Sequence, residues 1–557
     1  MFGPNSARYD FGPAHPLTPR RFGPGIDLLE HVGARPGLAP EPAPDEELLM
    51  CHSARYLAAV KRLSKDPWGP PEAGIGPGGD NPSFARMHEA GAAVAGGSLR
   101  AIDAILRGDV EHAFHPGGGL HHALRDRASG FCIYDDPALA ISRARLAGLR
   151  VLYLDFDVHH GDGVQAIHWD DPGVLTLSFH ESGRYLFPGT GFVGEIGEGE
   201  AAGTSLNVTF EPGAGEGAWL SAVSSLVPAV AAAFGPDVVV SQHGCDTHAW
   251  DPLAHLRITT TAMGDAARLV DRVAHRWASG RWLSTGGGGY DAYRVVPRVW
   301  SLVWLAGAHL PTPTSTPEAW RERWAAEAGR FGQAPLPSTF VDEPNAGEPV
   351  DAEQRAAEAA SLAGLGLVEM VAVPALLREA ARRGWWDAAA DLVGPARAES
   401  ARPATGAPTI VDPLTSADLA GLAVAQRVVA PFDPSAVKEL LLAALHGTDS
   451  TMVAAVAGDT IVGLAIATSG RLLALGVAPS FRRQGIAGRL LAALAARVDG
   501  EIEALVTVAE RDPVEPLDYA LRVSIARRLL ERAGFNVEAA PPPLARVDAR
   551  ATRAIRP

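Results

Sequence analysis

Short apolar runs alternate with longer helical patterns along the N-terminal half of the chain. Near-continuous apolar runs of this kind are typical of strands that are buried on both faces of a parallel sheet. The longest uncharged stretch, residues 218–236, contains Ser and Pro, and we interpret it as a buried helix and not as a membrane span. The pattern predicts an α/β domain in which helices sandwich a parallel sheet. Its strands are expected at residues 151–155, 174–179, 237–242 and 281–285.

The pattern changes after residue 408 to a mixed α+β arrangement. Two strands, 452–456 and 460–466, are predicted to form a hairpin around the Gly458-Asp459 turn. A third strand, 472–477, leads through a Gly-containing loop into a helix that extends through Arg497. Residues 352–392 have helical spacing, and the stretch 395–408 is rich in Pro and Ala, as interdomain linkers are. We therefore expect four parts: a domain over 1–332, a helical bridge with a linker over 333–407, a domain over 408–540 and a tail over 541–557.

Composition and charge narrow the classes of function. The 557 residues are 47% hydrophobic and 20% charged, which excludes wholesale disorder. From Pro403 onward 16 basic and 16 acidic residues balance, so the net charge of −15 lies in the preceding part of the chain. Such an acidic body disfavours nucleic acid as a partner and would favour cationic substrates such as lysine side chains or polyamines. The alternative is that the charge only maintains solubility. No secretory signal or membrane partner is indicated, and a cytoplasmic location is expected.

Carboxylates and imidazoles follow the predicted strands. In an open parallel sheet the functional site lies outside the carboxyl ends of the strands. The first of these four strands is followed by Asp157 and His159, which are two residues apart, and the third is followed by Asp246. Two Asp and one His leave coordination positions open, as catalytic Zn²⁺ sites do, while the oxygen-rich set also admits Fe²⁺. The alternative is that these acids cap loops or pair with Arg.

Two glycine-rich segments offer further candidate groups. His121 and His122 follow three glycines, and a His beside a metal-bound water can act as general base or acid. Each imidazole needs an orienting carboxylate, for which Asp155 and Asp162 are candidates. Tyr290 follows four glycines after the last strand, where its hydroxyl could donate to an oxyanion. The alternative for the His pair is that it is only solvated.

Taken together, these motifs resemble the arginase-like, zinc-dependent histone deacetylase superfamily, and within it the bacterial acetoin-utilisation deacetylases. The resemblance covers about residues 9–309, although the family usually begins with a strand, and only eight residues precede Tyr9 here. Either that strand is missing or the start codon lies further upstream. The matching segments are HPLTPRR (15–21), GGDNPSF (78–84), PGGGLHHA (116–123), LDFDVHHGDG (154–163), LSFHESGRYLFPGTG (177–191), QHGCDTHAWDPL (242–253) and GGGGYD (286–291).

The resemblance implies a role for each matched position. It implies that Zn²⁺ is bound by Asp157, His159 and Asp246, and that His121 and His122 are the acid–base pair, oriented by Asp155 and Asp162. Tyr290 would stabilise the oxyanion. The substrate would be contacted by Asp80 at the rim, by Phe131 and Phe187 along the acyl-lysine channel, and by Arg21 at the inner acetate pocket. A structural K⁺ would be held by Asp155, Asp157, His159, Ser178 and Phe179.

The C-terminal part contains a candidate anion site. A strand, a Gly-containing loop and a helix N-terminus can cradle a phosphate with backbone N–H groups, although the same pattern also occurs in ordinary strand–helix connections. The VxPxxRxxGxA segment and the late Ala533-Gly534-Phe535 resemble the Gcn5-related N-acetyltransferases (GNAT) over about residues 408–537. Many members carry a Tyr where this chain has Leu530, so acetyl-CoA binding is a better expectation than acetyl transfer. The binding residues would be Val477, Arg482, Arg483, Gln484, Gly485, Ile486, Ala487 and Gly488.

These observations lead to one main hypothesis and two alternatives. The main hypothesis is a metal-dependent amidohydrolase that removes acetyl groups from protein lysine, fused to an acetyl-CoA-binding domain, so that the chain controls reversible protein acetylation. One alternative is a small-molecule amidohydrolase that acts on acetylpolyamines. The other is that the C-terminal domain is a non-catalytic acetyl-CoA sensor that regulates the deacetylase.

Overall fold

The computed structural model divides the chain into two units, Met1–Glu379 and Ala380–Pro557. The residues that the structure describes are 1–342, 351–385, 409–411, 450–457, 460–468, 471–477, 485–498, 501–506, 529–539 and 549–554.

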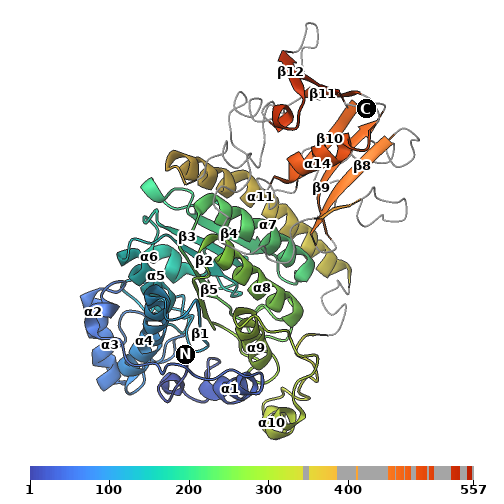
Figure 1. The fold of residues 1–557 in the computed structure, drawn as a ribbon. Coiled ribbons are helices and arrows are strands. Elements are labelled where there is room, and N and C mark those ends of the chain that lie inside the picture. The colour runs from blue at the N-terminus through green and yellow to red at the C-terminus, as the bar shows by residue number, and fades with distance from the viewer. Residues whose placement is uncertain are drawn as a thin grey trace. The chain divides into compact units, whose positions relative to one another are not determined.

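The first unit is built on a sheet of six parallel strands (Figure 1). Their order across the sheet is β1-β6-β5-β2-β3-β4. The strands are β1 (His112–His115), β2 (Val151–Asp155), β3 (Val174–Glu181), β4 (Ser205–Phe210), β5 (Val238–Gln242) and β6 (Trp282–Thr285). The four strands predicted from apolar runs are β2, β3, β5 and β6, and all four predictions are confirmed. The other two strands lie at the edges of the sheet, where they carry polar residues and lack a continuous apolar run.

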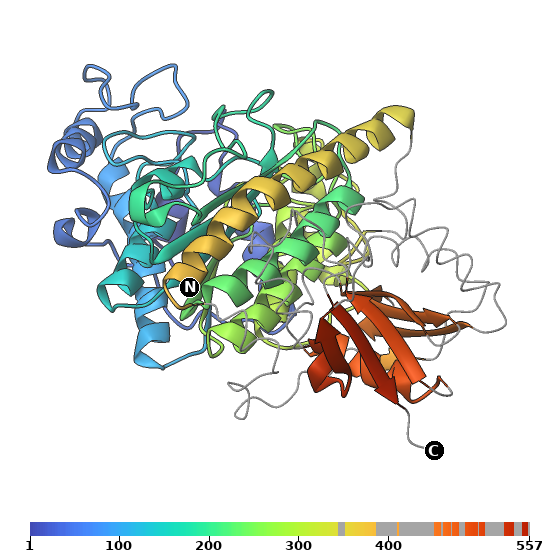
Figure 2. The same ribbon diagram turned by 90° about the horizontal axis from the view of Figure 1, so that it is seen from above.

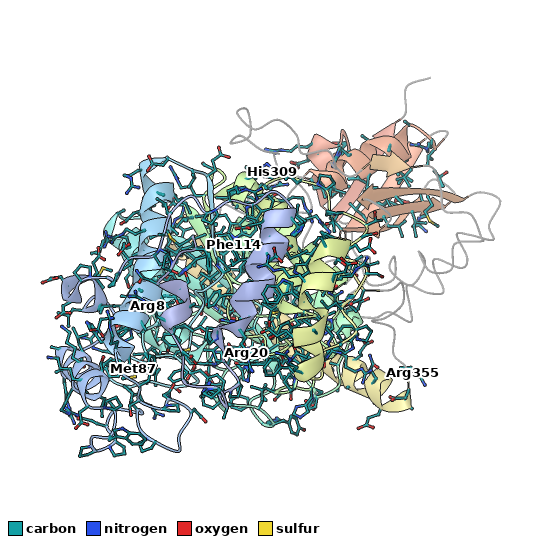
Figure 3. All side chains as sticks on the ribbon, turned by 90° about the horizontal axis from the view of Figure 1, so that it is seen from below. Arg8, Arg20, Met87, Phe114, His309 and Arg355 are labelled. Atoms are coloured by element: carbon teal, nitrogen blue, oxygen red, sulfur yellow. The ribbon has the colours of Figure 1, made fainter. Side chains whose placement is uncertain are left out.

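Helices cover both faces of this sheet. The helices α4 and α5 pack on one face, against β1, β6, β2 and β5, whereas α7, α8 and α9 pack on the other. Figure 3 shows the described side chains filling the space between the layers. The helices are α1 (Phe22–His31), α2 (Asp45–Leu48), α3 (Ala54–Lys65), α4 (Met87–Arg107), α5 (Asp136–Leu146), α6 (Asp162–Ile167), α7 (Glu216–Phe234), α8 (Thr260–Trp277), α9 (Val296–Gly307), α10 (Glu318–Arg330) and α11 (Ala352–Arg382), with short 3-10 turns η1 (Ser6–Arg8), η2 (Pro19–Arg21) and η3 (Gly199–Ala201).

Two of these helices, α7 and α11, are long and apolar enough to cross a membrane by length and composition. Helix α7 corresponds to the uncharged stretch 218–236, and it ends where Gly235 adopts a left-handed conformation with φ of +61°. Its Trp219 and Phe234 are fully buried against the sheet, as expected for the core helix predicted there. Figure 2 shows α11 running alongside α7, and Ser361 of α11 accepts a hydrogen bond from the backbone N–H of Glu211. Helix α7 therefore packs within the protein. Helix α11 buries Leu365, Val368 and Leu376, whereas its Leu367, Met370 and Val371 are 49%, 53% and 42% exposed.

The N-terminal segment contains a 3-10 turn and no strand before Tyr9. The amino group of Met1 donates a hydrogen bond to the carbonyl of Phe114 on β1, at 2.7 Å. Strand β1 is consequently the edge of the described sheet on this side.

The second unit contains a mixed sheet in the order β12-β13-β11-β10-β9-β8-β7. The predicted hairpin is confirmed by the antiparallel pairing of β8 with β9, and the third predicted strand corresponds to β10. The helix expected to extend through Arg497 is α14, and it ends at Ala495. The side chain of Arg497 lies beyond this end and donates a hydrogen bond to the carbonyl of Ala493. The elements are β7 (Thr409–Val411), β8 (Ser450–Ala457), β9 (Thr460–Thr468), β10 (Arg471–Val477), α14 (Ile486–Ala495), β11 (Glu501–Val506), β12 (Asn536–Ala539) and β13 (Ala549–Ala554).

Candidate active site

The loops after four neighbouring strands meet at one edge of the parallel sheet. Strands β1, β6, β5 and β2 lie side by side and run in the same direction, so their carboxyl ends share that edge. The loop after β2 carries Asp157 and His159, and the loop after β5 carries Asp246. The glycine-rich segments that precede His121 and Tyr290 follow β1 and β6. The topology therefore gathers chemically active residues from distant parts of the sequence.

Three of these residues form a buried group of possible metal ligands. One ligand atom from each of Asp157, His159 and Asp246 lies within 4.8 Å of the others, and all three side chains are buried. His159 Nδ1 lies 3.1 Å from Asp157 Oδ1 and 3.2 Å from Asp246 Oδ2. Two carboxylates and one imidazole at these separations fit a divalent cation with coordination positions left for water or substrate.

Backbone and amide groups hold the two carboxylates in place. Asp157 Oδ2 accepts hydrogen bonds from Gln242 Nε2 at 2.7 Å and from the backbone N–H of Gly288 at 2.8 Å. Asp246 Oδ1 accepts from the backbone N–H of Val158 at 2.9 Å. Outer contacts of this kind fix the direction in which a ligand points. The role of Gln242 was not foreseen from the sequence, because an amide beside a metal ligand has no spacing signature of its own.

Glycine at position 288 makes the close approach of the carboxylates possible. A Cβ atom added to Gly288 would lie 2.0 Å from Asp246 Oδ2 and 2.7 Å from Asp157 Oδ2. Such distances are too short for any side chain, so both ligands depend on the absence of a Cβ there.

The charges in this cluster are strongly coupled. Burial and the neighbouring charge of Asp157 raise the pKa of Asp246 to about 6. Burial alone would also raise the pKa of Asp157, but nearby His121 and His159 outweigh it and hold that pKa well below its usual range. Burial would lower the pKa of His159, yet its hydrogen bonds to the two carboxylates raise it to about 10. A concentration of negative charge in a buried cluster is what a divalent cation would neutralise.

The two adjacent histidines are each oriented by a carboxylate. His121 Nδ1 lies 2.7 Å from Asp155 Oδ2, and His122 Nδ1 lies 2.6 Å from Asp162 Oδ1. Both pairs match the partners expected from the sequence. Because Nδ1 is engaged in each ring, the Nε2 atom is left to exchange protons with a substrate or water. Tyr153, which the sequence did not single out, also donates its hydroxyl to Asp155 Oδ2, at 2.7 Å.

The two imidazoles differ in protonation. Burial would lower the pKa of His121, but the charges of Asp155 and Asp157 raise it to about 10. Burial and the charge of His121 lower the pKa of His122 to about 4, although Asp162 opposes this shift. The neighbouring carboxylates thus favour the charged form of His121, whereas burial next to His121 favours the neutral form of His122.

A carboxylate on α5 shapes the loop that carries this pair. Asp136 is fully buried and accepts hydrogen bonds from the backbone N–H groups of Gly119 and Leu120, at 2.8 to 3.0 Å. It also accepts from the hydroxyl of Ser98. This role could not be predicted from the sequence, because an Asp before Pro137 is also the ordinary beginning of a helix.

A pocket opens above the ligand cluster. Tyr290 and Phe131 lie in its wall with their ring centroids 6.0 Å apart and nearly perpendicular. Burial and the nearby Asp246 raise the pKa of Tyr290 well above its ordinary value, so its hydroxyl stays protonated and able to donate. The lining residues are Leu17, Gly119, Leu120, His121, His122, Gly130, Phe131, Cys132, Asp157, His159, Gly287, Gly288 and Tyr290.

The remaining expected substrate contacts occupy different positions. Phe187 is 40% exposed, and its ring lies 5.0 Å from that of His122, beside the pocket. Arg21 is buried and donates to the carbonyl of Gly287 at 2.6 Å. Asp80 is exposed and does not belong to the pocket lining, although its backbone carbonyl contacts His15 at 3.2 Å.

The residues expected around a monovalent cation lie on neighbouring strands. Asp155 is paired with Ser178 in the β2–β3 register, and Phe179 follows Ser178. Asp157 and His159 follow directly after β2. All five side chains are buried, and the Ser178 hydroxyl lies 2.8 Å from His180 Nδ1.

The second unit contains part of the expected acetyl-CoA loop. Val477 ends β10, and Gly485 begins α14 with a left-handed φ of +70°. Ile486 is buried under the sheet, Ala487 and Gly488 are in the first turn, while Arg482, Arg483 and Gln484 lie outside the described residues. Within the described strands, β10 and β11 are paired in parallel only at Arg471 and Leu472.

Leu530, which stands where many acetyltransferases carry a Tyr, is a core residue. It is 5% exposed and belongs to an apolar cluster with Leu491 and Phe535. A side chain in that environment supplies packing and no proton.

Each of the two units contains a segment that matches a known protein family. Residues 15–306 match the model of the histone deacetylase domain, and residues 421–516 match that of the acetyltransferase (GNAT) domain. The chain is 41% identical to the acetoin utilization protein AcuC of Bacillus subtilis (strain 168) over 349 residues, which are 61% of this chain and 89% of that protein. It is 36% identical to AcuC of Staphylococcus xylosus over 344 residues, 60% of this chain and 88% of the relative.

Solved structures give the same result for the fold. A histone deacetylase (HDAC) homolog from Aquifex aeolicus superposes with a TM-score of 0.55 and 28% sequence identity, covering 64% of this chain and 97% of that one. An HDAC homolog complexed with SAHA superposes with a TM-score of 0.56 and 29% identity, covering 64% of this chain and 96% of that one. The superposed share of the chain is similar in extent to the first unit.

Proposed function

Because this chain belongs to the histone deacetylase family, we propose that it hydrolyses the acetyl amide of acetylated lysine in proteins. The observation that carries this proposal is the buried Asp157–His159–Asp246 group beside two carboxylate-oriented histidines and a tyrosine in one pocket. A deacetylase of this kind converts an acetylated lysine and water into lysine and acetate.

The three buried donors suit Zn²⁺, and the oxygen-rich set also suits Fe²⁺. A divalent ion held by Asp157, His159 and Asp246 would polarise a carbonyl and lower the pKa of a water bound to it. His121 and His122 take a proton from the attacking water and return a proton to the leaving amine through their Nε2 atoms. Tyr290, which stays protonated, donates its hydroxyl to the carbonyl oxygen as negative charge develops on it.

The walls of the pocket favour an extended alkyl chain. Phe131 lines the pocket and Phe187 lies beside it against His122, and aromatic side chains of this kind accept the methylene chain of a lysine. We place Arg21 next to the released acetate, because its buried guanidinium lies behind Gly287 of the lining. Asp80 lies exposed near His15 and is proposed to contact the substrate backbone at the rim.

Substrate class is tested by comparing acetate release from an acetyl-lysine peptide and from N-acetylputrescine by the zinc-loaded full chain. Our proposal predicts the higher kcat/KM for the peptide. A higher kcat/KM for N-acetylputrescine would instead identify a small-molecule amidohydrolase and contradict the proposed protein substrate.

We further propose a structural K⁺ at Asp155, Asp157, His159, Ser178 and Phe179, supported by the register that pairs Asp155 with Ser178. The expected result is a loss of thermal stability when K⁺ is exchanged for a large organic cation. An unchanged melting temperature would contradict this site.

For the second unit we propose acetyl-CoA binding by Val477 and the segment 482–488. The support is the GNAT match and the helix that begins after Gly485, since helix N-termini bind phosphate. The buried Leu530 favours a sensor over a transferase. If the domain is a sensor, acetyl-CoA should change the rate of deacetylation by the native chain but not by an Arg482→Ala variant. The sensor would be contradicted if acetyl-CoA had no effect on deacetylation and the native chain transferred acetyl groups in a reaction that the variant loses. Deacetylation combined with acetyl-CoA binding fits a cytoplasmic protein that controls reversible acetylation.

A further inference from the structure

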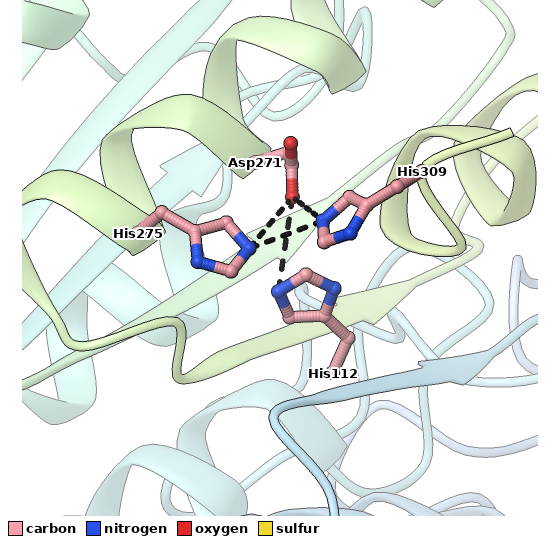
Figure 4. Close-up of side chains that lie close together, drawn as sticks. All are labelled: His112, Asp271, His275 and His309. Carbon is pink, nitrogen blue, oxygen red and sulfur yellow. Dashed lines mark hydrogen bonds and ion pairs between the residues drawn. The ribbon is translucent and has the colours of Figure 1, made fainter. Parts of the chain in front are cut away.

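A second group of metal-binding side chains lies at the other edge of the parallel sheet. His112 is the first residue of β1, so it lies at the amino end of the strands, whereas the candidate active site lies at their carboxyl ends. Asp271 and His275 are one turn apart on α8, and His309 follows the end of α9. Figure 4 shows the four side chains pointing toward one another. No motif used for the proposed function includes any of them.

The distances in this group match those of a metal site. Asp271 Oδ1 lies 3.7 Å from His112 Nε2, 3.5 Å from His275 Nε2 and 3.0 Å from His309 Nε2. The Nε2 atoms of His275 and His309 are 3.1 Å apart. Ligands that surround Zn²⁺ tetrahedrally at about 2.0–2.1 Å are separated from each other by about 3.3 Å. The measured separations lie on both sides of that value.

His112 points a lone pair into the group. Its Nδ1 lies 2.7 Å from the carbonyl oxygen of Gly307 and must carry a proton to donate to it. In the neutral ring, Nε2 is then an acceptor. This atom is buried and has no hydrogen-bond partner in the described part of the chain. An acceptor facing a carboxylate at 3.7 Å is unfavourable unless a cation lies between them, and a backbone carbonyl on the other ring nitrogen is the usual support of a metal-binding His.

The other two histidines converge on the same point. His309 Nε2 is within hydrogen-bond distance of both Asp271 Oδ1 and His275 Nε2, but a single ring nitrogen carries at most one proton. His309 has a left-handed backbone with φ of +56°, as residues just after a helix often do, and Figure 4 shows its ring pointing toward Asp271 and His275. A hydrogen-bond network alone therefore accounts poorly for three imidazoles around one carboxylate oxygen.

We propose that His112, Asp271, His275 and His309 bind a second divalent transition-metal ion of the Zn²⁺ class. Three imidazoles and one carboxylate favour Zn²⁺, Co²⁺ or Ni²⁺ over Mg²⁺ and Ca²⁺, which prefer oxygen. Four protein ligands close a tetrahedral shell, as structural sites do. The ion joins the edge strand β1 to α8 and to the end of α9, and its role is to stabilise this edge. This inference does not depend on deacetylation.

The test uses tag-free full-length protein in which Asp246→Asn disables the first site. This variant is titrated with Co²⁺ and Zn²⁺, and bound metal is measured after removal of free ions. The expected result is one tightly bound ion per chain, with the visible absorption of tetrahedral Co²⁺. Adding His309→Ala, whose side chain is 52% exposed and whose loss should not disturb the core, is expected to weaken binding by about 10–100-fold or more.

Thermal unfolding supplies an independent readout. Zn²⁺ should raise the melting temperature of Asp246→Asn by a few degrees, and this rise should disappear with His309→Ala. His31→Ala is the matched control, because His31 is a partly exposed helix residue next to Asp27 and outside both metal clusters. Unchanged binding in the His309→Ala protein, or binding of Asp246→Asn only at millimolar metal, would overturn the proposal. Loss of deacetylation alone would not affect it.

Discussion

Replacing Gly288 with Ala tests the geometry of the candidate active site without removing any ligand. The added Cβ would lie 2.0 Å from Asp246 Oδ2, whereas real Cβ contacts are essentially never shorter than 3.0 Å. The backbone at this position is held by its N–H to Asp157 and by its carbonyl, which accepts from the N–H of Cys245 at 3.0 Å. The carboxylate of Asp246 must therefore retreat by about 1 Å, a displacement that typically costs about 100-fold in activity.

The expected loss of metal affinity is at least about 10–100-fold, which corresponds to about 1.4–2.7 kcal/mol of binding free energy. Affinity is measured by competition with a chelator of known strength, in parallel with acetate release and thermal unfolding. Gly194→Ala is the matched control, since a Cβ at Gly194 meets open space. A Gly288→Ala protein that folds and binds Zn²⁺ as tightly as the native chain would refute the assignment of Asp246 as a ligand.

Three further substitutions probe groups that support the site and the fold. Asp136→Ala should lower the free energy of unfolding by about 2–4 kcal/mol and reduce kcat, because it leaves the buried N–H groups of Gly119 and Leu120 unpaired. An unchanged denaturant midpoint and an unchanged kcat would contradict this role. Burial would raise the pKa of Asp342, but the hydrogen bond from His248 and the charge of Arg298 hold it far below the ordinary 3.8, so its stabilising contribution is complete above pH 3.8 and is lost as the pH falls below that value. Asp342→Asn leaves the fully buried Arg298 without its ion pair and should lower the free energy of unfolding by about 3–5 kcal/mol at neutral pH. It should also flatten the acid part of a curve of stability against pH. An acid decline as steep as that of the native chain would contradict this role of Asp342. Tyr9→Phe removes the hydroxyl that donates to the carbonyl of Phe131 at 2.7 Å. We expect a raised KM in steady-state kinetics and a loss of about 1–2 kcal/mol of stability in denaturant unfolding. Native values of both quantities would show that this hydrogen bond is dispensable.

The central strands of the fold could be predicted from sequence because burial on both faces leaves a continuous apolar run. Strand β1 could not, since its sequence His-Ala-Phe-His is only partly buried at the edge of the sheet. The loops after β2 and β5 were predictable for a related reason. Strand ends are visible as the point where an apolar run stops, and parallel strands bring those points to one edge.

Groups that act from a distance in sequence could not be predicted. Asp136 acts on backbone groups of Gly119 and Leu120, and nothing in its own neighbourhood distinguishes it from a helix-capping residue. The second histidine group shows the same limit. Only Asp271 and His275 have helical spacing, and the other two members join them through the packing of β1 against α9 and of α9 against α8.

Acetate release from an acetyl-lysine peptide by the zinc-loaded full chain, compared with its Tyr290→Phe variant, tests the central claim most directly. The account predicts equal amounts of acetate and free lysine from the native chain. It predicts a kcat about 100–1000-fold lower in Tyr290→Phe with the bound metal unchanged, because only the oxyanion donor is lost. Absence of release by the metal-loaded native chain, or native kcat in Tyr290→Phe, would contradict the assignment of this pocket as a lysine deacetylase site.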